Sequence, residues 1–278
     1  METLLRCGLI LKREWRKRVL QRLKRGGLLF RRRLAWLAAM SVFMPDLSFS
    51  PDATVSVRRV GQEDQPVLVI DGAMAHPDNM VEIARRVPFR APDRSMYPGV
   101  TAPLPPIYFR ELLRKVRPLL SDMFGIWPEV ELTAHGFLAL ATRPPEALHP
   151  MQKIPHQDAA DPMRLGMVHY FCQAPHAGTA FFRHTATGFE TVDAARREVF
   201  APIAIEELKA QDASSMPHVG PETRNYDMTG QVEAQFNRLI IYRANLLHAG
   251  LLEGAALSDD PDAGRLTANV FVGEGAPE

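Results

Sequence analysis

Residues 237–250 read NRLIIYRANLLHAG, and this stretch decides the fold class. Its apolar run at 239–242 is too short for a helix, and its β-branched and aromatic residues favour a strand. Gly, Pro and polar clusters separate it from runs of the same kind at 137–140, 166–171, 179–182 and 266–272. These runs are too many for one hairpin and do not alternate regularly with helices. The sequence therefore predicts a sandwich or a jelly-roll barrel.

The first half of the chain has a different pattern, because its apolar residues recur mainly at helical spacing. Pro77 suits the first turn of one amphipathic helix, and a second helix is predicted at 111–124. A single strand-like run lies at 66–71. The Pro-rich segment 97–106 predicts irregular structure. We expect the loop 97–108 to act as a lid on the substrate side.

These patterns predict one folded domain at 46–278, preceded by a separate extension at 1–45. The domain belongs to the α+β class. Residues 46–130 provide helical support, and residues 131–278 form the jelly-roll core.

The extension is strongly basic, although the whole chain has a net charge of only +1. Residues 1–33 carry 12 Lys and Arg against two Glu, a net charge of +10, whereas residues 34–278 have a net charge of −9. We predict that the extension is poorly ordered or an isolated helix. A basic helix on an anionic membrane and a nucleic-acid-binding tail are the functional alternatives. The acidic body disfavours nucleic acid as its substrate, since a phosphate backbone needs a basic groove.

The composition is that of an ordinary globular protein, with 46% apolar and 23% charged residues. The two cysteines, Cys7 and Cys172, are too few for a disulfide framework or a four-cysteine zinc site. Free thiols of this kind make the cytoplasm the default location. Neither the substrate nor the oligomeric state can be predicted from the sequence.

One grouping of residues has the character of a metal site: His156-Gln157-Asp158, with His248 far downstream. On an extended backbone, residues i and i+2 point to the same side, so His156 and Asp158 can reach one ion. A histidine from a facing strand then completes a 2-His-1-carboxylate triad, which leaves open positions on Fe(II). A short His-x-Asp motif also arises by chance. The structural alternatives are a surface-loop pair for His156 and Asp158 and a strand-end role for His248.

A candidate anion clamp follows this motif along the chain. Arg265 and Thr267 share one face of the strand-like run that begins after Gly264. A guanidinium binds a carboxylate through two parallel hydrogen bonds, so an inward arginine beside a hydroxyl suits a carboxylate ligand. The alternatives are an ion pair of Arg265 with Asp260 or Asp262, and a clamp made instead by Arg238 or Arg243.

The order His-x-Asp, distal His and Arg-x-Thr resembles the 2-oxoglutarate/Fe(II)-dependent dioxygenases, especially their prolyl-hydroxylase-like branch. The stretches 152–158, 169–170, 178–190 and 237–242 also resemble an uncharacterised bacterial family placed near those oxygenases. The resemblance covers residues 46–272.

This resemblance implies a double-stranded β-helix that holds Fe(II) and uses 2-oxoglutarate and O2 to hydroxylate a peptidyl or small-molecule substrate. The implied metal ligands are His156, Asp158 and His248. The implied co-substrate contacts are Arg265 on the distal carboxylate, Thr267 and Tyr170. Two other functions remain open: a non-catalytic jelly roll that binds iron or a ligand for iron handling or sensing, and a cupin-like metalloenzyme that does not need Arg265.

Several neighbouring residues have structural interpretations. Tyr170 is equally consistent with a core role, and His169 is expected on the opposite strand face, away from the site. Arg183 and His184 are expected to be polar strand-end residues. The long spacing between Asp158 and His248 requires an insertion, near 185–230.

Overall fold

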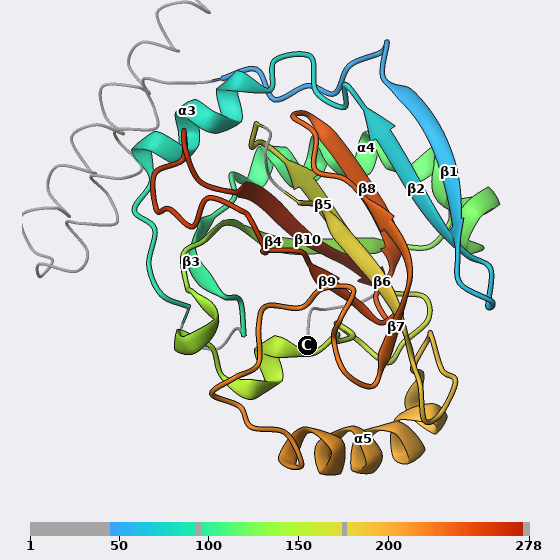
Figure 1. Ribbon diagram of the computed structural model, residues 1–278. Helices are drawn as coiled ribbons and strands as arrows, with labels where there is room; N and C mark the ends of the chain where they lie inside the picture. Colours follow the sequence, from blue (N-terminus) through green and yellow to red (C-terminus); the bar gives the residue numbers. More distant parts are fainter. Residues whose placement is uncertain (1–44, 93–95, 174–176, 275–278) are drawn as a thin grey trace, which may run out of the picture. The chain divides into compact units, whose positions relative to one another are not determined.

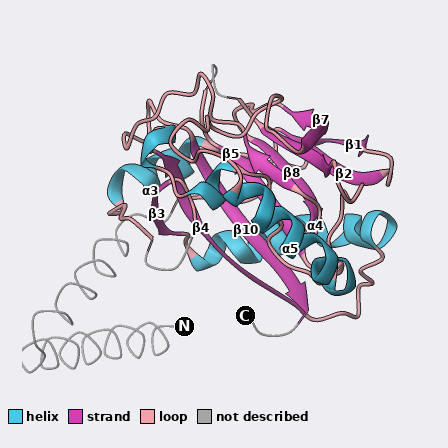
Figure 2. Ribbon diagram, turned by 60° about the horizontal axis from the view of Figure 1, so that its bottom comes forward, coloured by secondary structure: helices cyan, strands magenta, loops and turns pink. Residues whose placement is uncertain are grey.

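The computed structural model describes residues 45–92, 96–173 and 177–274, and those from Leu47 onward belong to one compact unit (Figures 1 and 2). The prediction for the basic extension therefore lies, except for its last residue, outside the described residues. The helices are α3 (Asp78–Arg86), α4 (Pro106–Phe124) and α5 (Ala194–Lys209), with short 3-10 turns at η1 (Pro145–Ala147) and η2 (Pro150–Lys153). The strands are β1 (Thr54–Val60), β2 (Gln65–Asp71), β3 (Gly99–Pro103), β4 (Leu132–Ala141), β5 (Leu165–Tyr170), β6 (Thr179–His184), β7 (Tyr226–Val232), β8 (Arg238–Arg243), β9 (His248–Gly250) and β10 (Leu266–Glu274).

The strands form two antiparallel sheets, so the chain has the predicted mixture of helices and sheet. The larger sheet has the order β1-β2-β8-β5-β10-β4-β3, and the smaller has the order β7-β6-β9. From β4 onward, the chain passes several times between the two sheets: β4 and β5 belong to the larger sheet, β6 and β7 to the smaller, and β8, β9 and β10 to the larger, smaller and larger sheet. His156 lies between β4 and β5 and forms an isolated antiparallel bridge with His248, the first residue of β9. The segment that carries the His-x-Asp motif therefore extends the edge of the smaller sheet.

Neighbouring residues of β6 pack in two different clusters of the core. Phe181 packs in the cluster that also contains Tyr170 and Tyr242 from the larger sheet. The next residue, Phe182, points to the opposite face and packs with residues that include Phe200 of α5. β6 is thus buried on both faces, and both phenylalanines have no exposed surface.

Helix α4 packs on the outer face of the larger sheet, as its amphipathic pattern predicts (Figure 1). It begins at Pro106, five residues before the predicted start, because proline is well tolerated in the first turn of a helix. Its buried Tyr108 contacts His169 of β5, with 2.9 Å between the phenol oxygen and Nδ1. His169 therefore points away from Tyr170, as expected for neighbouring strand residues.

The prediction of irregular structure at 97–106 was wrong, because residues 99–103 of this segment form strand β3. β3 is the last strand of the larger sheet, where it pairs with β4, and on its other side only Thr101 forms a bridge, with Arg90. Pro103 is its last residue, and a proline at the end of an edge strand removes no essential hydrogen bond from the sheet.

Residues 46–130, predicted as helical support with one strand-like run at 66–71, contribute more strands to the larger sheet than predicted. β1, β2 and β3 all come from this part of the chain and belong to the larger sheet. β2 lies between β1 and β8, and its residues from Pro66 to Ile70 are buried. A continuous apolar run of this kind is typical of a strand that is covered on both faces.

The expected insertion between β6 and β7 contains α5, which the sequence analysis did not identify. Ala204 is the buried residue of this helix, and Pro202 lies inside it, so no apolar stripe marks it in the sequence. A local signal was available: the Asp193 side chain caps the helix by accepting a hydrogen bond from the Arg196 amide at 2.9 Å.

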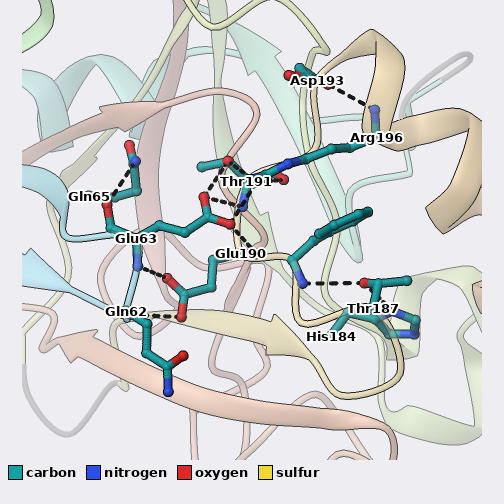
Figure 3. A network of polar contacts seen from close by, with 10 residues as sticks. Gln62, Glu63, Gln65, His184, Thr187, Glu190, Thr191, Asp193 and Arg196 are labelled. Carbon is teal, nitrogen blue, oxygen red and sulfur yellow. Dashed lines mark hydrogen bonds and ion pairs between the residues drawn. The ribbon is translucent and has the colours of Figure 1, made fainter.

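Two glutamates connect the β1–β2 turn to the segment before α5 (Figure 3). The Glu190 carboxylate accepts hydrogen bonds from the amides of Gln62 and Glu63, both at 2.8 Å. In return, the Glu63 carboxylate accepts from the Thr191 hydroxyl at 2.5 Å and from Arg196 Nη1 at 2.6 Å. Because each segment accepts hydrogen bonds from donors of the other, these contacts fix the two segments relative to one another.

Within residues 45–92, 96–173 and 177–274, no helix combines the length and apolar character needed to cross a bilayer.

Candidate metal centre and co-substrate pocket

The structure brings His156, Asp158 and His248 together. His156 and His248 exchange two backbone hydrogen bonds, with N···O distances of 3.0 and 2.9 Å, and the Asp158 amide donates to the carbonyl of Ala244 at 2.8 Å. Each of the three side chains offers one ligand atom, and these atoms all lie within 4.8 Å of one another. The Asp158 carboxylate lies 3.3 Å from His248 Nε2 and 3.6 Å from His156 Nε2. The backbone pairing thus places the predicted ligands around one point.

The protonation states of these residues suit a divalent metal. His248 Nδ1 lies 2.7 Å from the Leu246 carbonyl, which can only accept a hydrogen bond, so Nδ1 carries the proton and Nε2 faces the cluster. Burial opposes charge on Asp158, but His248 outweighs it and holds the pKa of Asp158 below its usual value. Burial and then the neighbouring His248 lower the pKa of His156 to about 4, although 54% of its side chain is exposed to the hollow around it. Two imidazoles and one ionised carboxylate are ligands that fit Fe(II).

Gly166 of β5 provides the space for the carboxylate. A Cβ at this position would lie 3.1 Å from Asp158 Oδ2 and 2.9 Å from the ring of Tyr242. The Tyr242 ring also packs on His248, with 4.6 Å between the ring centroids. Tyr242 belongs to the site although sequence reasoning gave it no role. Its only signal was its place in the strand run that precedes His248.

The metal cluster opens into a cavity of about 360 Å3. Arg265 and Thr179 also line this cavity, together with residues from the larger sheet such as Asn269 and Phe271. The cavity therefore lies where the strands of both sheets meet, with the possible metal ligands and a buried arginine on its walls.

Arg265 is 3% exposed, and no carboxylate of the described residues pairs with it. Its guanidinium donates to the carbonyls of Ala177 and Gly178, at 3.2 and 3.0 Å, and lies 5.5 Å from the centre of the Tyr170 ring. The remaining donors of its planar fork can serve a ligand, because an arginine has five N–H groups. A buried guanidinium of this kind suits a carboxylate.

Hydroxyl groups surround this guanidinium. The Thr267 hydroxyl is fully buried and has no hydrogen-bond partner at normal distance. Thr267 pairs with Tyr170 across β10 and β5, and the Tyr170 phenol lies 2.7 Å from the Thr179 hydroxyl. Burial raises the pKa of Tyr97, whereas Arg265 and the Thr267 hydroxyl act in the opposite direction, so Tyr97 is a further neighbour of both. Sequence reasoning missed Thr179 and gave Tyr97 only a place in a lid.

Tyr170 lies behind this pocket rather than on its wall. It is fully buried in the core, and burial raises its pKa to about 12. Its contact with Thr179 extends the core toward the cavity. Tyr170 therefore has the core position that was one of its two predicted roles, and a direct contact with a co-substrate stays a prediction.

The alternatives to Arg265 have other partners. Asp262 pairs with Arg85 at 2.6 Å, so the predicted ion pair with Arg265 is not formed there. Arg238 pairs with Asp71 at 2.6 Å, and Arg243 donates to the Pro162 carbonyl at 2.6 Å. The predicted strand-end residues also have partners: Arg183 pairs with Asp227, and His184 Nε2 lies 2.8 Å from the Glu207 carboxylate, within hydrogen-bond distance.

The predicted lid at 97–108 is only partly consistent with the structure. Met96, Tyr97 and Pro98 line the cavity, but the residues that follow belong to β3 and α4. A lid over the whole segment was therefore a wrong prediction, since most of the segment has regular structure.

Comparisons with known proteins add the following. The model of a family described as "Family of unknown function (DUF6445)" matches residues 51–272. No curated protein matches the chain. A crystal structure of a novel N-substituted L-amino acid dioxygenase from Burkholderia ambifaria AMMD has a TM-score of 0.35 and 10% identity, covering 82% of this chain and 94% of that one. A structure of such an enzyme from the same organism in complex with alpha-KG has a TM-score of 0.34 and 12% identity, with the same coverage. Likeness at this level carries no argument about the site.

Proposed function

The chain belongs to the DUF6445 family of unknown function, and we propose from its site that it is an Fe(II)- and 2-oxoglutarate-dependent oxygenase. One observation carries this proposal. A single cavity has on its walls both a cluster of two histidines and one carboxylate, and a buried arginine without a carboxylate partner among the described residues. A dicarboxylate that chelates a metal through one end needs metal ligands and, for its other carboxylate, a cation in the same cavity.

The strand order supports a double-stranded β-helix as the fold of this oxygenase. Eight segments follow one another along the chain from β4 to β10. β4, β5, β8 and β10 belong to the larger sheet, whereas the bridge at His156, β6, β7 and β9 belong to the smaller one. Eight antiparallel segments distributed over two sheets are typical of a jelly roll. His156 and His248 pair at the edge of the smaller sheet, and Arg265 immediately precedes β10 of the larger one.

In the proposed enzyme, His156, Asp158 and His248 hold Fe(II). Arg265 binds the distal carboxylate of 2-oxoglutarate, with the hydroxyls of Thr267 and Thr179 beside it. Ferrous iron and 2-oxoglutarate together supply the oxidation of a substrate by O2, with release of succinate and CO2. The chain's own contribution is to fix the ligands, orient the co-substrate and exclude water through the buried walls of the cavity.

The proposal is tested by adding Fe(II) and 2-oxoglutarate to the protein without O2 and recording the visible spectrum. We expect a metal-to-ligand charge-transfer band, which disappears in His156→Ala and weakens in Arg265→Ala. Admission of O2 is expected to produce succinate. A matched control is His149→Ala, because His149 is an exposed histidine of the same chain outside the metal cluster.

The outcomes separate the three functions. Iron binding without the band and without succinate would contradict the oxygenase and indicate an iron-binding protein. An iron-dependent oxidation that persists in Arg265→Ala and needs no 2-oxoglutarate would indicate a cupin-like metalloenzyme.

A further inference from the structure

The two sheets contribute different groups to the cavity beside the metal cluster. His248 and Gly250 of β9 line it from the smaller sheet. The Arg265 guanidinium also lies on this side, because it donates to the Gly178 carbonyl at 3.0 Å and a Cβ on Gly250 would be 3.5 Å from its Nη2. A co-substrate held between Arg265 and a metal at His248 would therefore lie along β9. The wall that the larger sheet provides is left for another molecule.

Three side chains of this larger-sheet wall, Phe137, Asn269 and Phe271, point toward the cavity. Asn269 pairs with Phe137 across β10 and β4, and Phe271 lies two residues farther along β10, so all three share one face of the sheet. β10 lies inside the sheet, between β5 and β4, and yet the three residues are partly exposed. Ala268 and Val270, on the opposite face of β10, are buried. The exposed surface of the three residues therefore faces the cavity, which they line.

Asn269 is the polar residue of this wall. Within the described part of the chain its side-chain amide has no hydrogen-bond partner, and neither of its two polar atoms is enclosed by protein. Its cross-strand neighbours, Phe137 and Val168, are apolar. A side-chain amide has both an acceptor oxygen and N–H donors. The group that complements it best is therefore one that also donates and accepts, such as another amide.

The cavity walls offer little to a charged substrate. Among the described residues that line the cavity, Asp158 is the only acidic residue and Arg265 the only lysine or arginine. Asp158 already faces the two histidines of the metal cluster, and Arg265 is the proposed anchor of the co-substrate. The histidine outside the cluster, His218, donates through Nε2 to the Arg143 carbonyl at 3.1 Å. A further charge would lose water here without gaining a counter-ion, which costs more than the entry of a neutral group.

We propose that Asn269 recognises the substrate, and that the substrate presents an uncharged amide with apolar flanks to the larger-sheet wall. The inference rests on the proposed oxygenase function and names the substrate class of the same site. Phe137 and Phe271, whose ring centroids are 6.3 Å apart, provide apolar contacts beside Asn269. Phe271 pairs with Gly166, where a Cβ would lie 3.1 Å from Asp158 Oδ2. A molecule on this wall therefore lies next to the metal cluster.

The experiment compares three probes of similar size: hexanamide, which is neutral, hexanoate and hexylammonium. The full chain is loaded with Zn(II), which is diamagnetic, and saturated with 2-oxoglutarate so that Arg265 is occupied. Saturation-transfer NMR on the methyl group of each probe then gives its dissociation constant. We expect hexanamide to bind at least about tenfold more tightly than either charged probe.

Two substitutions of Asn269 test its part in this preference. Asn269→Leu keeps the size of the side chain but removes the amide, and is expected to weaken hexanamide binding about tenfold. Asn269→Asp supplies a counter-ion, and is expected to make hexylammonium the tightest of the three probes. The control Asn79→Leu, on α3 and outside the cavity, is expected to keep the affinities of the wild type.

Two results would overturn the proposal. One is a charged probe that binds the wild type as tightly as hexanamide, and the other is an unchanged affinity for hexanamide in Asn269→Leu. If that variant weakens the binding of 2-oxoglutarate alone, Asn269 serves the co-substrate and the proposal fails. Thermal unfolding shows whether each variant is folded, and if Asn269→Leu is not, the order of the probes in Asn269→Asp decides.

The Fe(II) charge-transfer band is recorded in parallel on the wild type and the variants. If the wild-type chain shows no band but keeps an Asn269-dependent preference for hexanamide, the oxygenase function fails while the amide site stands. A band in a wild type that does not prefer hexanamide has the opposite meaning, because the oxygenase then stands and the substrate class is wrong.

Discussion

His169 shows how a buried polar residue can be confined to one protonation state. Its Nε2 lies 3.1 Å from the Asn237 amide oxygen, and Asn237 is fixed in orientation because its amide group bonds the backbone of Met74 through both atoms. Nε2 therefore donates, and Nδ1 accepts a hydrogen bond from the phenol of Tyr108. The neutral imidazole is fully satisfied, and a second proton on it would break the contact with α4.

This arrangement predicts a loss of stability in acid. Burial lowers the pKa of His169 to about 3, whereas the unfolded value lies near 6.5. Between these values the unfolded chain binds more protons, so the free energy of unfolding falls as pH drops from 6.5 toward 3, by up to about 1.4 kcal/mol per pH unit. Urea denaturation of wild type and His169→Gln at pH 7, 6, 5 and 4 measures this slope. We expect a shallower slope in the variant, and an unchanged slope in the exposed control His76→Gln. Equal slopes in wild type and His169→Gln would contradict the assignment.

Arg265 gives a second prediction at this scale, which depends on the proposed oxygenase function. Lysine keeps the positive charge but lacks the planar fork. Arg265→Lys should raise the KM for 2-oxoglutarate about 10- to 100-fold, or roughly 1.4–2.8 kcal/mol of binding, with iron affinity nearly unchanged. Succinate formation at varied 2-oxoglutarate gives the KM, and Arg183→Lys is the surface control. A wild-type KM in Arg265→Lys would show that the co-substrate anchor lies elsewhere.

At the scale of elements, the contacts of Glu63 and Glu190 hold the β1–β2 turn against the start of α5. The ion pair of Glu63 with Arg196 is only partly buried, since the two side chains are 22% and 37% exposed. Much of the contact is therefore hydrogen bonding from backbone and hydroxyl groups, which depends on geometry more than on net charge.

Glu63→Gln tests this connection. Glutamine removes the charge and leaves one oxygen to serve several donors, so we expect a loss of about 1–2 kcal/mol in the free energy of unfolding, measured in urea. The matched control is Glu82→Gln on α3, whose partners Arg85 and Arg86 are exposed, and its expected effect is within about 0.5 kcal/mol. If the two variants lose the same amount, the connection has no special role.

The elements also show what the sequence could and could not predict. Strands such as β8 were predicted because an uninterrupted apolar run leaves few alternatives, and the helix α4 because its apolar residues recur on one face. β3 was missed because its proline, Pro103, is acceptable only at a sheet edge, a position that depends on the other strands. α5 was missed because its residues are largely exposed, so neither face is marked by apolar residues.

For the candidate site as well, the sequence could predict some residues and not others. His156, Asp158, His248 and Arg265 could be proposed from residue type and spacing. Thr179 and Tyr242 could not, because only strand pairing brings such common residues to the cavity. That pairing brings together segments such as 165–170 and 238–243, which are far apart in the chain.

For the whole molecule, the proposed function predicts that metal and co-substrate stabilise the folded state, because both would bind residues that only the fold brings together. A ligand at 100 times its dissociation constant adds about 2.7 kcal/mol, which corresponds to a rise in Tm of roughly 5–11 °C for a domain of this size. Thermal denaturation with Mn(II), and then with Mn(II) plus 2-oxoglutarate, measures the two contributions. Asp158→Ala should lose both, and Arg265→Lys only the second. A rise with metal in Asp158→Ala would contradict the ligand assignment.

The position of Gly250 has a consequence for which co-substrates fit. Gly250 lies two residues beyond His248, and a Cβ there would be 3.5 Å from Arg265 Nη2. The metal ligand and the neighbour of the guanidinium are therefore successive same-side positions of one strand, separated by a fixed length of backbone. In the proposed enzyme this backbone fixes the distance between the metal and Arg265, and so the length of the dicarboxylate that can bind both. A dicarboxylate with one methylene fewer would not reach both groups, and one with a methylene more would have to bend between them.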